Sequence, residues 1–130
     1  MNIDKMIAQI ESIETSKLNH PFKVGILPND GKMIVGFPEA ILDFDESGFC
    51  LYTFDGLVKL TYEGQKYRIS YDQIIEIELG KYNFKDRYMK VIVGDDKFVA
   101  FSYLLKHRKY PYHAKNMKVF FDKIESISEA

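Results

Sequence analysis

Between residues 49 and 103, hydrophobic positions alternate with polar ones over short stretches, a period that is typical of β-strands. Asp55-Gly56 is a favoured two-residue hairpin turn, and it predicts Leu51 opposite Leu60. Gly64-Gln65 predicts a second turn, which returns the chain along the strand of Leu60. Side chains that lie directly opposite each other share a face. The pattern therefore predicts an antiparallel meander with one apolar face and one charged face.

The same alternation, interrupted by turn signals, predicts further strands at 23–27, 33–37, 40–44, 75–79, 88–93 and 97–103. Apolar residues recur at helical spacing in two other places, from Ile3 to Ile13 and from Met117 to Ile127. Pro21 ends the first helix, because the residue before a proline is pushed out of the α region. The chain is thus predicted to be mainly β, of the α+β class, with a helix at each end of the strand region.

Length and composition indicate one folded domain. The 130 residues are 46% hydrophobic and 28% charged, as in soluble globular proteins. We expect a single domain over 1–130, with an N-terminal helical extension at 1–20, an antiparallel β roll at 21–113 and a C-terminal helix at 114–130. The net charge of −1 gives no global attraction to nucleic acid or to anionic membranes, so nucleic acid is a disfavoured partner. Because we find no signal peptide and no apolar run of about 20 residues, we expect a cytoplasmic protein without a transmembrane segment.

Residues that could carry chemistry are few. The soft metal ligands are His20, His107, His113 and Cys50. The spacing of His107 and His113 is not a zinc-site spacing, and Cys50 has no histidine partner at motif spacing. No glycine-rich loop that could hold a phosphate precedes a helix. We therefore expect no metal site, no cofactor and no enzymatic activity.

The order of elements and one sequence pattern carry a resemblance to a known family. Tyr71-Asp72-Gln73-Ile74 opens a strand that follows the meander, and a hairpin and an amphipathic helix from about Ala114 come after it. Over roughly residues 40–127 this arrangement is similar to the bacterial pleckstrin-homology-like (GRAM-like) domains. The resemblance implies a strongly bent antiparallel sheet, a partly open barrel with the final helix plugging one end. It also implies binding rather than catalysis, because that fold serves lipid-headgroup, peptide and oligomerisation roles.

The direction of the later strands gathers a set of cations and aromatic residues at one end of the sheet. If the strands at 73–79, 88–93 and 97–103 run up, down and up, the loops at 80–87 and 104–113 emerge together, near the Gly64-Gln65 turn. The candidate ligand-binding rim consists of Lys66, Lys81, Tyr82, Lys85, Arg87, Lys106, Arg108, Lys109, Tyr110 and Tyr112. Cations beside aromatic rings suit an anionic headgroup, an acidic or phosphorylated peptide, or single-stranded nucleic acid. The alternative is a solvated rim whose charges offset the acidic remainder of the chain.

Two functions remain open from the sequence. The first is a non-enzymatic intracellular binding or assembly module of the pleckstrin-homology-like type. Its partner would be another protein or a second copy, or else an anionic ligand or membrane headgroup. The second is a small phage-borne or toxin-neutralising protein-interaction factor that acts through a sheet edge or a helix.

Overall fold

The computed structural model describes residues 2–27, 39–54, 61–81, 86–95, 97–105 and 110–128. The elements in chain order are α1 (Ile3–Glu14), β1 (Phe22–Ile26), β2 (Glu39–Phe44), β3 (Gly48–Thr53), β4 (Lys66–Ser70), the 3-10 turn η1 (Tyr71–Gln73), β5 (Glu76–Lys81), β6 (Arg87–Gly94), β7 (Lys97–Tyr103) and α2 (Tyr112–Ser128). The seven strands form one antiparallel sheet in the order β4-β3-β2-β1-β7-β6-β5. Its two end strands, β4 and β5, do not pair, so the sheet is not closed. This architecture confirms the predicted α+β class and both terminal helices.

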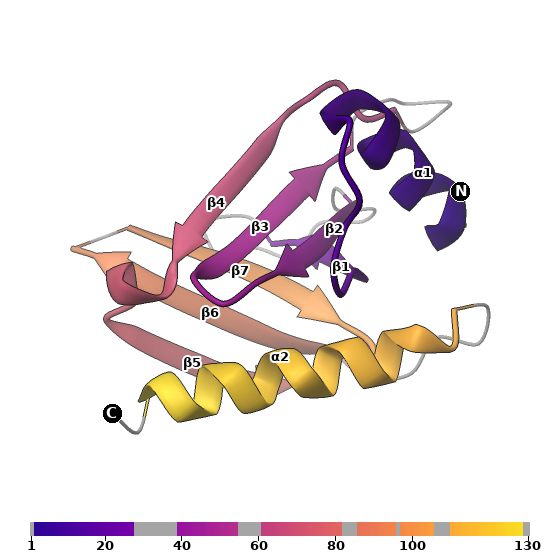
Figure 1. Cartoon of the computed structure of the whole chain (residues 1–130). Helices are drawn as coiled ribbons and strands as arrows, with labels where there is room; N and C mark the ends of the chain where they lie inside the picture. The colour runs from indigo at the N-terminus through magenta and orange to yellow at the C-terminus, as the bar shows by residue number, and fades with distance from the viewer. Residues whose placement is uncertain are drawn as a thin grey trace.

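The sheet is strongly bent, and α2 packs against one of its faces (Figure 1). Phe120 of α2 is fully buried, and its ring centroid lies 5.7 Å from that of Phe22, 5.2 Å from that of Phe44 and 5.4 Å from that of Phe49. These three rings come from β1, β2 and β3. The main core therefore lies between α2 and the bent sheet, as the apolar stripe of the C-terminal helix predicts.

Helix α1 covers the other face of the sheet, at β2 and β3. Met6 and Ile10 are fully buried there, in one cluster with Ile41 and Tyr62. Ile13, the last apolar residue of the predicted stripe, stays 55% exposed. The N-terminal helix thus packs on the sheet of its own chain, and β2 and β3 are buried on both faces.

The predicted register of the meander is wrong. Leu51 lies opposite Tyr67 of β4 rather than opposite Leu60, because β3 pairs directly with β4. The predicted middle strand overlaps residues 55–60, which lie outside the described residues. Tyr62 at its end is held by α1: its N–H donates to Gln9 Oε1 at 3.0 Å and its hydroxyl donates to Glu14 at 2.9 Å. Contacts with α1 therefore replace the strand pairing that the local pattern predicts for Tyr62.

The other predicted strands agree with the structure, except that the predicted hairpin of 23–27 with 33–37 is not observed among the described residues. The segment 33–37 lies outside the described residues, and β1 pairs with β2 and β7. Within the described part of the chain, neither helix is both long and apolar enough to cross a membrane.

Candidate functional site

Two cations face each other at one end of the β5–β6 ladder. Lys81 ends β5 and lies directly opposite Arg87, which begins β6, and Arg87 lies opposite Tyr103 of β7. Like charges that are directly opposite in a sheet destabilise it. Among the described residues neither cation forms an ion pair. An anionic group bound between Lys81 and Arg87 would remove this repulsion.

Tyr103, which lies opposite Arg87 in the sheet, is anchored in the core. The tyrosine is only 5% exposed, and its ring centroid lies 5.0 Å from that of Phe121 on α2. Burial raises the pKa of Tyr103, and the positive charge of Arg87 acts in the opposite direction. The row of Lys81, Arg87 and Tyr103, which lie opposite one another on β5, β6 and β7, leads from the solvent to α2.

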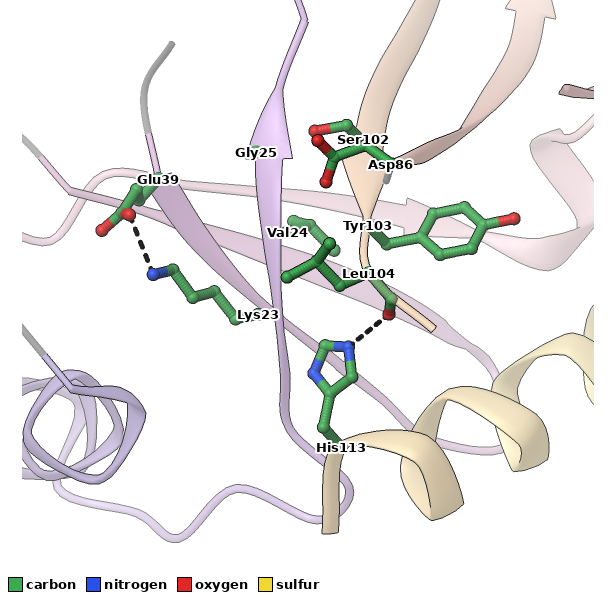
Figure 2. Close-up of a pocket in the computed structure, with 9 residues that line it drawn as sticks. All are labelled: Lys23, Val24, Gly25, Glu39, Asp86, Ser102, Tyr103, Leu104 and His113. Atoms are coloured by element: carbon green, nitrogen blue, oxygen red, sulfur yellow. Dashed lines mark hydrogen bonds and ion pairs between the residues drawn. The ribbon is translucent and has the colours of Figure 1, made fainter. Parts of the chain in front are cut away.

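A small pocket of about 170 Å³ lies next to this row, where β1, β7 and the first turn of α2 meet (Figure 2). Its lining residues are Lys23, Val24, Gly25, Glu39, Asp86, Ser102, Tyr103, Leu104 and His113. The Lys23 ammonium lies 2.8 Å from the Glu39 carboxylate. Sites for drug-sized ligands occupy about 300–1,000 Å³. The pocket thus has room for one small group and not for a whole metabolite.

His113 closes the pocket on the side of α2. Its ring is 1% exposed, and Nε2 lies 2.7 Å from the Leu104 carbonyl oxygen. Because a carbonyl oxygen can only accept, Nε2 carries the hydrogen. The ring also makes an edge contact with Phe22, at 5.8 Å between centroids. This histidine ties the first turn of α2 to the end of β7.

The two described tyrosines of the predicted rim differ in role. Tyr110 is 7% exposed, and its hydroxyl donates to the Pro21 carbonyl oxygen at 3.2 Å. The Asn116 side-chain amide donates to the same oxygen at 2.8 Å. Tyr112 is 61% exposed, with its ring centroid 5.9 Å from that of Tyr110. Only Tyr112 is therefore available to stack on a ligand.

Lys66 is not part of this group. It begins β4, at the opposite end of the sheet order from Lys81 on β5. Its ammonium pairs with the Glu14 carboxylate of α1. The hydrogen bonds from Lys66 and Tyr62 lower the pKa of Glu14. The structure thus brings Lys81 and Arg87 together and places Lys66 with α1.

The remaining predicted rim residues lie outside the described residues: Tyr82, Lys85, Lys106, Arg108 and Lys109. Sequence reasoning missed Lys23 and Glu39, which meet only through the β1–β2 pairing. No local signal marks that pairing, because residues 28–38 separate the two strands.

The other buried polar groups hold the fold together. The Asp43 carboxylate accepts hydrogen bonds from the backbone N–H groups of Asn19 and His20, the latter at 2.6 Å, and burial raises its pKa. Burial also raises the pKa of the Cys50 thiol, which disfavours the reactive thiolate. Among the described residues, no three His, Cys, Asp or Glu side chains are grouped as metal ligands would be.

Together these features define an α+β domain with an open, seven-stranded antiparallel sheet, a helix on each face and a small pocket beside a pair of cations. A similar fold occurs in the hSac2 domain from human phosphoinositide phosphatase Sac2, with a TM-score of 0.56 and 11% sequence identity. The match covers 99% of this chain and 85% of that one, so the likeness extends over the whole domain. Neither protein-family models nor curated protein sequences match the chain.

Proposed function

We propose that this protein is a non-enzymatic binding module of the bacterial pleckstrin-homology-like type, whose rim at Lys81 and Arg87 takes an anionic group. The observation that carries the proposal is the like-charged pair across the β5–β6 ladder. The adjacent pocket offers a small volume lined by Lys23, Ser102 and His113 as well as by the carboxylates of Glu39 and Asp86, and Tyr112 offers an exposed ring. A phosphate or carboxylate at the end of a larger ligand matches this combination of charge and size.

The fold likeness adds a ligand class to test. The structurally similar domain belongs to a phosphoinositide phosphatase. The order of seven strands followed by a C-terminal helix supports the proposed pleckstrin-homology-like type. We therefore propose a phosphorylated lipid headgroup as the first ligand to examine. The buried Asp43, Cys50 and His113 support a role without catalysis, because each is engaged in packing or in backbone hydrogen bonds.

Co-sedimentation with vesicles tests this function. Vesicles of phosphatidylcholine with one-fifth phosphatidylinositol phosphate are compared with pure phosphatidylcholine vesicles. Each cation near an anionic surface contributes about 1 kcal/mol, so Lys81→Gln with Arg87→Gln should weaken binding about 30-fold. The matched control carries Lys5→Gln and Lys115→Gln, which remove two exposed cations from the helices. A second variant neutralises Lys106, Arg108 and Lys109 together.

Two outcomes contradict the proposal. Equal binding to both kinds of vesicle would show that the protein does not recognise the anionic headgroup. If both the Lys81 and Arg87 double variant and the triple variant still bind the anionic vesicles, the rim is not the binding site.

A protein-interaction factor is the second candidate, and the edge strand β5 favours it. Ile75 and Leu79 are 69% and 59% exposed at this edge. A partner that adds to β5 would cover them through apolar contacts and backbone hydrogen bonds. Such a complex should resist moderate salt, whereas binding at the cationic rim should weaken as salt screens the charges.

A further inference from the structure

Strand β4 lies at an edge of the sheet, and its outer backbone N–H and C=O groups have no partner among the described residues. The Thr53 N–H donates to the Gln65 carbonyl at 3.1 Å, and the Tyr71 N–H donates to the Ser47 carbonyl at 3.0 Å. Alternate residues of an antiparallel pair exchange hydrogen bonds, so the odd-numbered residues of β4 bond to β3. The N–H and C=O groups of Lys66 and Arg68 therefore point away from β3, toward the open edge.

The side chains of β4 are sorted between the two faces in the same way. Tyr67 lies opposite Leu51, and Ile69 lies opposite the buried Phe49, so both turn toward the core face. Lys66 and Arg68 turn to the other face. Tyr67 is nevertheless 59% exposed. The Tyr67 ring, although it lies on the core face, is thus only partly covered by the rest of the chain.

A groove of about 760 Å³ lies beside these side chains. One wall is β4, and the other is the β6–β7 hairpin with Val93 and Val99; the buried Leu51 lies at the base. These apolar residues all belong to the main core or pack against it. The groove therefore extends the core to the surface along the free edge of β4.

The charges around the groove have one sign. Among the described residues, its lining includes Lys66, Arg68 and Lys97 and no carboxylate. Lys66 and Arg68 are already paired with Glu14 and Asp45. Lys97 forms no ion pair among the described residues, and it lies on the same face of β7 as Val99.

We propose that the groove binds an extended peptide segment in which acidic and apolar residues alternate, and that this segment adds to β4 as an additional strand. Its backbone would bond to the free N–H and C=O groups of Lys66 and Arg68. Its apolar side chains would enter the groove beside Tyr67 and Ile69, and its acidic side chains would lie near the cations. Strand addition of this kind takes its affinity from the backbone and its specificity from alternate side chains.

The partner is a separate segment and not β5 of a second copy, although β5 has the required pattern of Ile77 and Leu79 alternating with Glu76 and Glu78. The Leu27 N–H donates to the Ala100 carbonyl at 2.9 Å, which fixes the even-numbered residues of β7 as bonded to β1. The odd-numbered residues of β7 therefore bond to the odd-numbered residues of β6. This leaves the even-numbered residues of β6 to bond to the even-numbered residues of β5.

The free backbone groups of β5 therefore belong to Ile77 and Leu79. Hydrogen bonding β5 to β4 would set these apolar residues opposite Lys66 or Arg68, on the wrong face. A free peptide has no such restriction, because either of its edges can face β4.

The test uses the full chain, labelled with ¹⁵N, and a capped heptapeptide of alternating valine and glutamate. Titration should shift the amide signals of Lys66 and Arg68. Lys66→Glu should weaken binding about fivefold, the factor that corresponds to one exposed ion pair, because Lys66 lies on the face that the acidic side chains take. Lys115→Glu makes the same charge change on α2, away from the groove, and should leave the affinity unchanged.

A pair of variants at one position isolates the backbone contact. Arg68→Ala removes the side chain and keeps the N–H, whereas Arg68→Pro also removes the N–H that points away from β3. Proline is tolerated in an edge strand when its missing N–H would face outward. Binding should be lost in Arg68→Pro and retained in Arg68→Ala, with unchanged amide spectra outside β4 showing that both variants fold.

Three results overturn the inference. One is the absence of amide shifts at millimolar peptide. Another is equal binding of a peptide with lysine in place of glutamate, or of one methylated on alternate backbone amides. The third is binding of dodecanoate in the groove without binding of the peptide, which would make the groove an acyl-chain site. The groove is distinct from the rim, so each of these results leaves the proposed function of Lys81 and Arg87 standing.

Discussion

Phe120 connects α2 to three strands, and its removal provides a quantitative test of the fold. The side chain has no solvent exposure, and its centroid lies within 5.7 Å of those of Phe22, Phe44 and Phe49. Truncation of a buried phenylalanine to alanine costs about 3–5 kcal/mol, as lost transfer free energy and as a cavity. We expect Phe120→Ala to lower the free energy of unfolding by about 4 kcal/mol, because aromatic rings from three strands surround the site and limit its collapse.

Urea unfolding followed by circular dichroism measures this loss. With a slope near 2 kcal/mol per molar, the midpoint should fall by about 2 M. Val119→Ala is the control on the same helix, since Val119 is 41% exposed and its truncation should change stability by less than about 0.5 kcal/mol. A loss of less than about 2 kcal/mol at Phe120, with an unchanged slope, would show that α2 does not carry the core as described.

Two further predictions concern carboxylates. Asp43→Ala leaves the backbone N–H groups of Asn19 and His20 without their carboxylate acceptor, which should cost about 3 kcal/mol and lower the melting temperature by about 10 °C, whereas Asp43→Asn should cost less. The hydrogen bond from Arg68 holds the pKa of Asp45 well below its usual range, despite partial burial. Because the folded-state pKa is lower than the unfolded one, Asp45 adds stability above pH 4 or so that is lost as the pH falls through the folded pKa. The urea midpoint of Arg68→Gln should therefore fall less between pH 5 and pH 2 than that of the unaltered protein, and equal falls would contradict the assignment.

The elements that the sequence predicts correctly are those that local periodicity determines. The stripe that includes Met117, Phe120 and Ile124 specifies the buried face of α2 without reference to any other segment. The β6–β7 hairpin is likewise local, since its strands are adjacent in the chain. The pairing of Lys81 with Arg87 follows from the same local logic, because β5 and β6 are also consecutive.

The errors lie where distant segments compete for the same residue. Turn chemistry predicts a ladder partner for Tyr62, yet Gln9 and Glu14 of α1 supply its hydrogen bonds. Lys66 is assigned to the rim by strand direction, but it pairs with Glu14 of α1 and begins β4, at the opposite end of the sheet order from Lys81. Local alternation carries no information about α1, because the helix lies about 50 residues earlier in the chain. The local pattern also does not predict the contact of Lys23 with Glu39 in the pocket, because residues 28–38 separate β1 from β2 in the chain.

The two proposed sites can be tested independently because the β6 strand separates them. Arg87 begins β6 at the rim, and Val93 lies near its other end at the groove. Six residues of extended chain span about 20 Å. Substitutions more than about 10 Å apart, with no shared partners, have additive effects. The rim variants should therefore leave peptide affinity unchanged and Lys66→Glu should leave vesicle binding at the rim nearly unchanged, so each set serves as a folding control for the other.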